Sequence, residues 1–299
     1  MNNNRILILG GTGVLGKALL DTCNQNQEIF ITYQKELPEK LQRLSTRQVD
    51  IRSKEQIKNA FDWADPGIVI HLAGIANVDL AETDYSLAYE VNVEGTVNVI
   101  NACKRHRSKL IFLSSNAVYN GDHPPYDEEA PRSSVNSYGN MKIQCEDLIS
   151  NCGLNFSIIR AILMYGWHYP SARANPVTNW IANLKNDKPI KVVDDRFSQP
   201  LFAQDCANTV WSIINQQADG IYNVAGPDRL SLFDFAIKVA DVFNFNKDLI
   251  TPVPSNYFPN IAPRPVDTSF IIDKIRNQLL IQPRGIDEGL KLMKLTQEV

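Results

Sequence analysis

The chain has 299 residues, of which 44% are hydrophobic and 21% are charged, and its net charge at pH 7 is −3. This composition is typical of a globular protein, and without a surplus of positive charge we expect no nucleic-acid partner. The N-terminus lacks a signal-peptide pattern and no apolar run is long enough to cross a bilayer, so the sequence predicts a soluble, cytoplasmic protein with no membrane partner.

Short apolar runs alternate with helical patterns over roughly the first half of the chain. Ser53 is typical of an N-cap, and the helix that follows it is expected to run through Phe61. The other helices are predicted at residues 14–23, 84–104 and 136–152, and the strands at 5–9, 28–33, 47–51, 68–71, 110–114 and 156–160. Apolar strands separated by helices indicate an α/β fold with a doubly wound, parallel Rossmann sheet.

Beyond Arg160 the alternation becomes irregular, which predicts a second lobe. Expected there are helices at 176–184, from 205 onward, at 232–243 and at 285–293, strands at 190–193 and 220–224, and a proline-rich stretch at 251–265. The strand at 220–224 is predicted to return to the main sheet. We therefore predict a Rossmann domain formed by residues 1–165 plus 200–226, and a smaller, discontinuous α/β substrate lobe formed by 166–199 plus 227–299.

A glycine-rich loop follows the first predicted strand and opens the first helix. Glycine there allows a sharp turn and a close approach of the backbone to a pyrophosphate, while the helix N-terminus offers free N–H groups and a partial positive charge. A purely structural turn is the alternative. The candidate cofactor contacts in this loop are Gly10, Thr12, Gly13, Val14, Leu15 and Gly16.

The end of the second strand bears on the choice of dinucleotide. NAD-binding Rossmann proteins usually carry an acidic residue there, whereas this chain has Thr32-Tyr33-Gln34-Lys35. Lys35 is able to pair with a 2′-phosphate, so we expect NADPH, with NADH as a possible alternative. Asp50 and Ile51, at the end of the third strand, are candidates for the adenine edge, or else a plain turn into the next helix.

A tyrosine and a lysine four residues apart share one helix face at Tyr138 and Lys142. A neighbouring ammonium favours the phenolate, and such a tyrosine is suited to proton transfer with an alcohol or ketone oxygen. Ser115 ends the strand before this helix, at the sheet edge where doubly wound folds bind ligands. The alternative is an ordinary Tyr–Lys pair on a helix surface.

Glycine loop, Ser115, Tyr138 and Lys142 together resemble the extended short-chain dehydrogenase/reductases. The resemblance implies that the tyrosine is the general acid/base, that the serine hydrogen-bonds the substrate oxygen and that the lysine orients the nicotinamide ribose. It further implies that Asn92 supports the active-site helix and a proton-relay water. A helix-surface asparagine is the alternative for that residue.

Further stretches are similar to dTDP-4-dehydrorhamnose reductases, namely residues 71–82, 124–129, 192–195 and 262–265. That similarity implies reduction by NADPH of the C4 keto group of a nucleotide-linked 4-keto-6-deoxy sugar. Leu72, Ala73 and Gly74 would line the cofactor, and Arg264 would bind the sugar-nucleotide phosphates. Asn116 is a further candidate substrate contact, and Trp167 a candidate to replace a pocket tryptophan for which this chain has Leu163.

Two other functions remain open at this stage. A Ser-Ser-x-Ala-Val-Tyr stretch at 114–119 also resembles sugar-nucleotide epimerases, which recycle bound NAD. The regulatory β subunit of methionine adenosyltransferase has this fold and binds NADP as a partner protein. The five cysteines and four histidines lack metal-ligand spacing, so no metal site is predicted, although an assisting Mg²⁺ stays possible, as does a homodimer.

Overall fold

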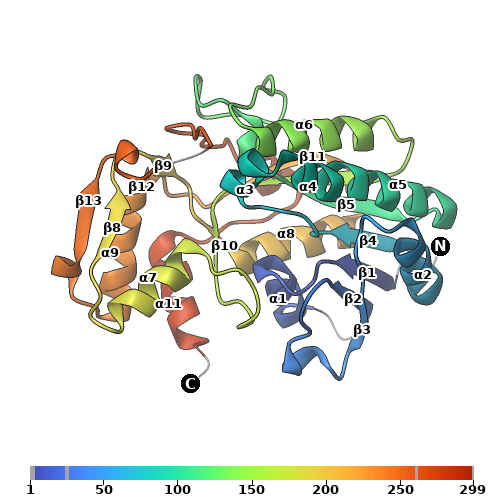
Figure 1. Cartoon of the computed structure of the whole chain (residues 1–299), viewed down its shortest axis with the longest axis horizontal. Coiled ribbons are helices and arrows are strands. Elements are labelled where there is room, and N and C mark those ends of the chain that lie inside the picture. Colours follow the sequence, from blue (N-terminus) through green and yellow to red (C-terminus); the bar gives the residue numbers. More distant parts are fainter. Residues whose placement is uncertain (1–3, 24–26, 260–261, 298–299) are drawn as a thin grey trace.

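In the computed structural model, which describes residues 4–23, 27–259 and 262–297, a seven-stranded parallel sheet has the order β11-β6-β5-β4-β1-β2-β3 (Figure 1). Its strands are β1 (Arg5–Leu9), β2 (Glu28–Tyr33), β3 (Ser45–Gln48), β4 (Ile68–His71), β5 (Lys109–Ser115), β6 (Phe156–Ala161) and β11 (Gly220–Val224). The order runs outward from β1 in both directions, which confirms the predicted doubly wound Rossmann sheet.

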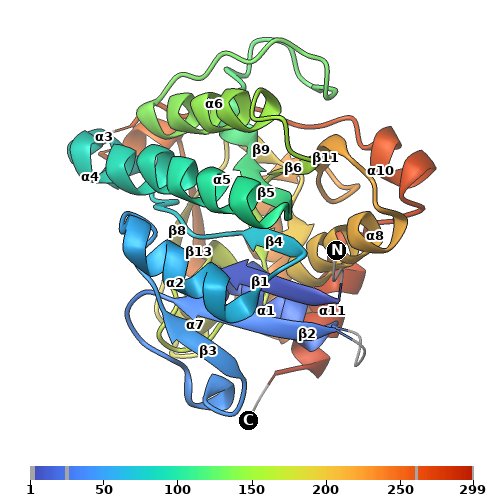
Figure 2. The same cartoon turned by 90° about the vertical axis from the view of Figure 1, so that its right-hand side faces the viewer.

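Helices cover both faces of the sheet because its central strands are apolar on both sides (Figure 2). One face is covered by α1 (Val14–Asp21) and α8 (Ala203–Gln216), the other by α2 (Lys54–Ala64), α5 (Gly95–His106) and α6 (Ser137–Ser150). Within β1, Ile6 and Ile8 join the core under α1 and α8, whereas Leu7 and Leu9 join the core under the other three helices. All four side chains have no exposed surface.

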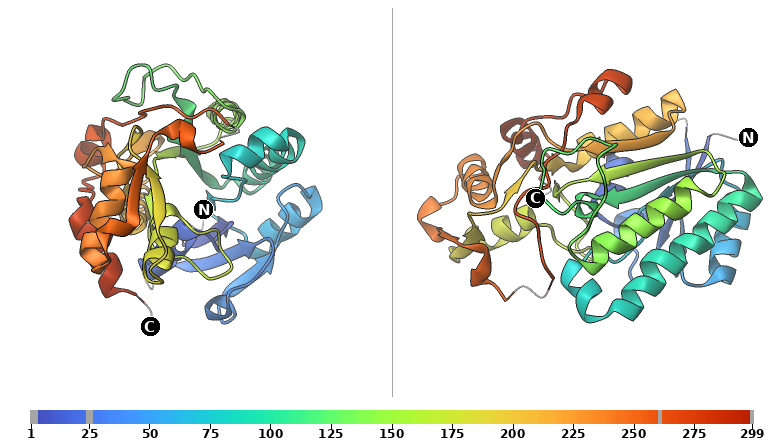
Figure 3. Two further views of the ribbon diagram at one scale, coloured as in Figure 1. Left: turned by 60° about the vertical axis from the view of Figure 1, so that its left-hand side comes forward. Right: turned by 90° about the horizontal axis from the view of Figure 1, so that it is seen from above.

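The second lobe lies beside the sheet and has its own apolar core around Tyr165, Phe235 and Leu290 (Figure 3). Its helices are α7 (Pro176–Leu184), α9 (Leu232–Phe243) and α11 (Ile286–Leu295). The short strands pair as β8 (Ile190–Val193) with β13 (Ile250–Val253), β9 (Phe197–Ser198) with β12 (Leu230–Ser231), and β7 (Met164–Tyr165) with β10 (Leu201–Phe202). One helix of the predicted lobe, α10 (Asp273–Gln278), instead places Ile275 in the core beneath the main sheet.

The structure differs from the predicted elements in two places that matter for the site. The third strand is β3 and not residues 47–51, and the predicted helix over 84–104 consists of α4 (Tyr85–Tyr89), a π-helical turn η2 (Glu90–Glu94) and α5. A short helix that the sequence analysis missed, α3 (Val78–Thr83), precedes them. Short 3-10 turns complete the described elements: η1 (Glu39–Leu41), η3 (Asn116–Val118), η4 (Lys247–Leu249) and η5 (Ser255–Tyr257). None of the helices described has the length and apolar character needed to span a membrane.

Candidate active site

The glycine loop between β1 and α1 is packed so tightly that side chains are excluded at several positions. Gly10 has a φ of +78°, and a Cβ there would lie 2.7 Å from the Cα of Ala73. A Cβ on Gly16 would lie 2.2 Å from the carbonyl oxygen of Gly11. No side chain caps α1 and its first turn contains no acidic residue, so its N–H groups are available to an anion. This cradle fits the pyrophosphate of a dinucleotide.

The loop after β4 lies against this glycine turn and is held in place by one asparagine. The side chain of Asn92 accepts a hydrogen bond from the Ile75 N–H (2.7 Å) and donates one to the Ile75 carbonyl oxygen (3.0 Å). A Cβ on Gly74 would lie 2.9 Å from the Asn92 Oδ1. Asn92 therefore determines the course of the segment Leu72–Gly74, the predicted cofactor lining.

Asn92 lies in the π-helical turn η2, and its backbone connects to the active-site helix. Its carbonyl oxygen accepts hydrogen bonds from the Thr96 hydroxyl (2.6 Å) and from the Cys145 thiol on α6 (3.1 Å). π-helical turns occur frequently at functional sites. The contact with Cys145 agrees with the predicted support of α6, while a part for Asn92 in a proton relay stays a prediction.

The end of β5 and the start of α6 bring together Ser115, Tyr138 and Lys142. The Ser115 hydroxyl accepts a hydrogen bond from the Ala117 N–H (3.1 Å), and a Cβ on Gly139 would lie only 2.0 Å from the Ala117 carbonyl oxygen. The first turn of α6 therefore packs directly on the loop that follows Ser115.

Within α6, the Nζ of Lys142 lies 5.8 Å from the centroid of the Tyr138 ring and 4.5 Å from that of Phe112. It donates a hydrogen bond to the Leu113 carbonyl oxygen (2.8 Å). Tyr138 and Lys142 each expose only 8% of their surface. Tyr138 and Lys142 thus lie on a helix packed beside the carboxyl end of β5, which ends at Ser115, and doubly wound folds bind their ligands at the carboxyl ends of their strands.

A segment of the C-terminal part of the chain, residues 262–270, passes beside this group. The Asn116 Nδ2 donates to the Thr268 hydroxyl (2.5 Å), and its Oδ1 accepts from the Ser115 hydroxyl (3.3 Å). The Nδ2 of Asn136, the N-cap of α6, donates to the Pro263 carbonyl oxygen (3.0 Å). The segment therefore forms one wall beside Ser115 and the start of α6, the candidate active site.

Two arginines lie along this wall, and the sequence analysis identified only one of them. Arg264 forms an ion pair with Asp79 (2.6 Å). Burial lowers the pKa of the Arg196 guanidinium, and the positive charge of Arg264 lowers it further, so the two cations are neighbours. Within the described part of the chain, the Arg196 guanidinium has neither a hydrogen bond nor an ion pair. Its position directly after the recognised stretch 192–195 was the only signal for it in the sequence.

Comparison with known proteins identifies the family. Residues 4–297 match the family described as the RmlD substrate binding domain. The chain belongs to this family. The match covers nearly the whole chain and confirms the predicted resemblance to an extended short-chain dehydrogenase/reductase and to dTDP-4-dehydrorhamnose reductases.

The relatives of this RmlD-family chain include reductases and β subunits of methionine adenosyltransferase 2. A dTDP-4-dehydrorhamnose reductase of Aggregatibacter actinomycetemcomitans is 27% identical over 98% of this chain and 99% of its own length. The crystal structure of the Bacillus anthracis dTDP-4-dehydrorhamnose reductase in complex with NADP has a TM-score of 0.87 and 28% identity, covering 98% of this chain and 99% of the other. The β subunit of methionine adenosyltransferase 2 of Mus musculus is 23% identical over 97% of this chain and 86% of its own. The reductase relatives confirm the prediction of an oxidoreductase.

Some predicted site residues of this RmlD-family chain have other contacts. The Trp167 indole N–H donates to the Met293 carbonyl oxygen (2.7 Å) and its ring packs edge-on against Phe243, so its contacts belong to the core of the second lobe. Ile51 is buried beneath α5, where a Cβ on Gly95 would lie 2.7 Å from its side chain. The structure thus buries the Ile51 side chain in one apolar core and packs the partly buried Trp167 ring against another.

Asp50 and Lys35 lie at the surface near the ends of β3 and β2. Asp50 forms an ion pair with Arg52 (2.6 Å), and the hydrogen bond from Arg52 lowers the pKa of that carboxyl group. Lys35 is exposed. A carboxylate already paired with an arginine is a weaker competitor for an anionic ligand than a free one, so this surface does not repel a phosphate strongly.

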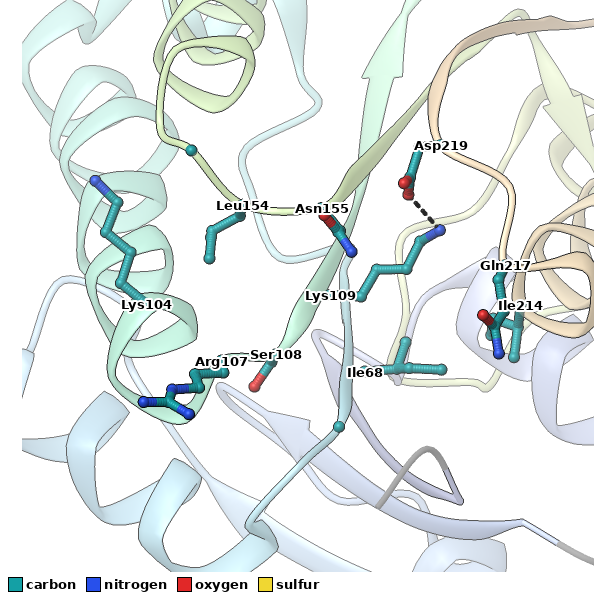
Figure 4. A pocket seen from close by; sticks show the side chains of 12 residues that line it. Ile68, Lys104, Arg107, Ser108, Lys109, Leu154, Asn155, Ile214, Gln217 and Asp219 are labelled. Carbon is teal, nitrogen blue, oxygen red and sulfur yellow. Dashed lines mark hydrogen bonds and ion pairs between the residues drawn. The ribbon is translucent and has the colours of Figure 1, made fainter. Parts of the chain in front are cut away.

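A cavity of about 570 Å³ lies at the amino-terminal ends of the strands β4 and β5, opposite the candidate active site (Figure 4). Ile68 and Lys109, the first residues of β4 and β5, line it together with the ends of the neighbouring helices, and Lys109 pairs there with Asp219 (2.6 Å). Lys109 and Ser115 are the two ends of β5, which at 3.3 Å per residue are about 20 Å apart. This cavity is therefore separate from the candidate active site. No group of three or more His, Cys, Asp or Glu side chains that could bind a metal occurs among the described residues.

Proposed function

We propose that this protein reduces the C4 keto group of a nucleotide-linked 4-keto-6-deoxy sugar, with NADPH as the hydride donor. The observation that carries the proposal is that the helix with Tyr138 and Lys142 packs against the end of β5 and the loop after Ser115, at the strand ends that also hold the glycine cradle. The dTDP-4-dehydrorhamnose reductase relatives, one of them solved with NADP, support this choice of cofactor and substrate class. A Streptomyces niveus relative named dTDP-4-keto-6-deoxy-D-glucose reductase supports the 4-keto-6-deoxy sugar.

The chemistry assigned to each residue follows from its surroundings. Bound NADPH supplies the hydride. Tyr138 donates a proton to the oxygen of the former ketone. The Ser115 hydroxyl, which accepts from the Ala117 N–H, turns its one proton from the Asn116 Oδ1 to hydrogen-bond the same oxygen. The Lys142 ammonium, with its Nζ 5.8 Å from the centroid of the Tyr138 ring, would supply positive charge beside the reacting groups.

The cofactor would be held at two places. The N-terminus of α1 and the loop from Gly10 to Gly16 would bind the pyrophosphate, with Leu72–Gly74 lining the other side. Exposed Lys35, after a strand that ends without a carboxylate, would pair with the 2′-phosphate that distinguishes NADPH from NADH.

Arg196 and Arg264 would bind the two phosphates of the sugar nucleotide. Neighbouring positive charges repel each other, and here burial and then the Arg264 charge lower the pKa of Arg196. A diphosphate placed between them relieves that repulsion and supplies the acceptors that the Arg196 guanidinium lacks among the described residues. With its diphosphate at these two arginines, such a ligand would extend its sugar along residues 264–268 toward Asn116 and Ser115, because Thr268 of the same segment contacts Asn116.

The test is the oxidation of NADPH, followed by its absorbance, with a dTDP-4-keto-6-deoxy sugar as substrate. Tyr138→Phe should lower kcat by about 10²–10⁴-fold, because it removes the proton donor, and should leave the affinity for NADPH unchanged. Tyr85→Phe is the matched control, since Tyr85 is 53% exposed and lies on α4. Wild-type turnover in the Tyr138→Phe variant would remove Tyr138 as the acid.

The same assay separates two other functions. Similarity to the β subunit of methionine adenosyltransferase 2 favours a regulatory subunit as the second candidate. In that case the protein would bind a methionine adenosyltransferase catalytic subunit and would reduce none of the keto sugars. An epimerase, by contrast, would retain NAD through purification and interconvert two sugar nucleotides without consuming NADPH.

A further inference from the structure

A glutamate without exposed surface lies on the active-site helix, one turn beyond Lys142 and two turns beyond Tyr138. The Glu146 carboxylate accepts hydrogen bonds from the Arg160 guanidinium (2.8 to 3.2 Å) and from Arg132 (3.1 Å). It also accepts a hydrogen bond of 2.5 Å from the hydroxyl of Ser114, which is 3% exposed. Burying an ion pair costs free energy that well-packed apolar residues would not cost. A buried carboxylate at this place therefore calls for an explanation beyond stability.

The hydrogen bonds between β5 and α6 involve the residues directly before Ser115. Leu113 accepts a hydrogen bond from Lys142, Ser114 donates one to Glu146, and the next residue, Ser115, carries the catalytic hydroxyl. Two successive residues of the strand are thus tied to the helix that carries Tyr138. The bond from Ser114 is the one adjacent to Ser115, and in the sheet register Ser114 pairs with Arg160 on β6.

The geometry points to Ser114 and Glu146 as positioning residues of the reaction. The Glu146–Arg160 ion pair provides a rigid acceptor for Ser114, and this bond fixes the peptide between Ser114 and Ser115. The distance between the serine hydroxyl and the Tyr138 phenol is thereby set. Hydrogen bonds suit this task because they are directional and strengthen in a buried, low-dielectric environment. The inference rests on the proposed function for the identity of the reaction only.

The test uses Ser114→Ala, because this variant leaves the ion pair intact, whereas a neutral residue at position 146 would leave Arg160 buried without its counter-charge. The first readout needs no substrate. The Ala117 N–H donates to the Ser115 hydroxyl, so its hydrogen exchange reports the position of that hydroxyl. We expect about tenfold faster exchange at Ala117 in Ser114→Ala, wild-type exchange in Ser114→Thr, and no change in the control Ser150→Ala, an exposed serine on α6.

The second readout is kcat with the keto sugar. Ser114→Ala should lower kcat about tenfold, with KM and the NADPH affinity unchanged, and Ser114→Thr should restore it. Because Ser114 acts through Ser115, Ser114→Ala should cause no further loss in a Ser115→Ala background.

Unchanged hydrogen exchange at Ala117 in Ser114→Ala overturns the inference. So does a double variant in which Ser114→Ala lowers kcat by the same factor as it does in the wild-type background. Unchanged kcat in Ser114→Ala, in an enzyme that turns over, overturns it as well. A wild-type protein that reduces no keto sugar refutes the proposed function instead, and the exchange at Ala117 then decides on the positioning role by itself.

Discussion

Acidification should destabilise this protein through one buried histidine. His71 ends β4, exposes 1% of its surface and has its Nε2 3.1 Å from the Thr96 hydroxyl. Thr96 donates its one hydroxyl proton to the Asn92 carbonyl oxygen, so His71 must donate through Nε2–H. Its Nδ1 is buried and has no partner among the described residues. Burial, and then the charge of Lys142, lower the pKa of His71 to about 3.

The sign of the effect follows from proton linkage. In the unfolded chain His71 takes up a proton below its ordinary pKa of about 6.5, while in the folded chain it stays neutral down to a pKa of about 3. Since the unfolded state binds the extra proton between these values, the free energy of unfolding falls as the pH is lowered through this window. The slope approaches about 1.4 kcal/mol per pH unit, so that lowering the pH from 6.5 to 4.5 costs about 2–3 kcal/mol. Above pH 6.5 the contribution is constant.

The measurement is urea unfolding of wild type and His71→Asn at several pH values between 7.5 and 4.5. Taking the difference between the two proteins cancels the carboxyl groups that titrate in both. The stability advantage of the wild type should shrink at about 1.4 kcal/mol per pH unit below pH 6.5. His123→Asn, at an exposed histidine, is the control measured beside it. Parallel pH curves for wild type and His71→Asn would refute the reasoning.

Two further substitutions test the packing around the site. Glu146→Gln should lower the free energy of unfolding by about 3–5 kcal/mol, because Arg160, which is 1% exposed, loses its counter-charge. Asp147→Asn removes only an exposed ion pair with Arg132, so in the same denaturation assay it should lower that free energy by less than about 1 kcal/mol. Gly139→Ala should lower kcat by about tenfold or more, because the added Cβ pushes the start of α6 away from the Ala117 carbonyl oxygen. The measurement is steady-state kinetics, with Asn140→Ala at an exposed position of α6 as the control. Equal kcat values in the two variants would contradict this prediction.

The sequence predicted the main sheet well where the strands are buried on both faces. The runs 28–33, 68–71 and 220–224 match β2, β4 and β11 residue for residue, because short runs rich in β-branched and aromatic residues favour strands. The edge strand β3 is polar, and because Val49 and Ile51 follow it, the strand was predicted at residues 47–51. The π-helical turn η2 was missed because helical periodicity does not show where one turn widens.

The site divides in the same way into local and tertiary parts. The glycine loop and the Tyr138–Lys142 pair are local patterns, and their spacing alone indicates their geometry. Arg196, Thr268 and Glu146 depend on contacts between segments far apart in the chain, so no local pattern marks them. One signal was available: Arg160 is a charge inside the apolar strand β6, and a charge in that position requires a buried partner.

Three buried polar side chains hold the segments around the site in place through hydrogen bonds. Asn92 holds the loop after β4, Glu146 accepts a hydrogen bond from the end of β5, and Asn136 caps α6 and reaches residues 262–270. All three side chains are nearly or fully buried. Apolar contacts are non-directional and allow small shifts, whereas a buried hydrogen bond loses much of its energy when its geometry changes. Proton and hydride transfer to one carbonyl require fixed distances, so directional anchors are the better support at the edge where the three segments meet.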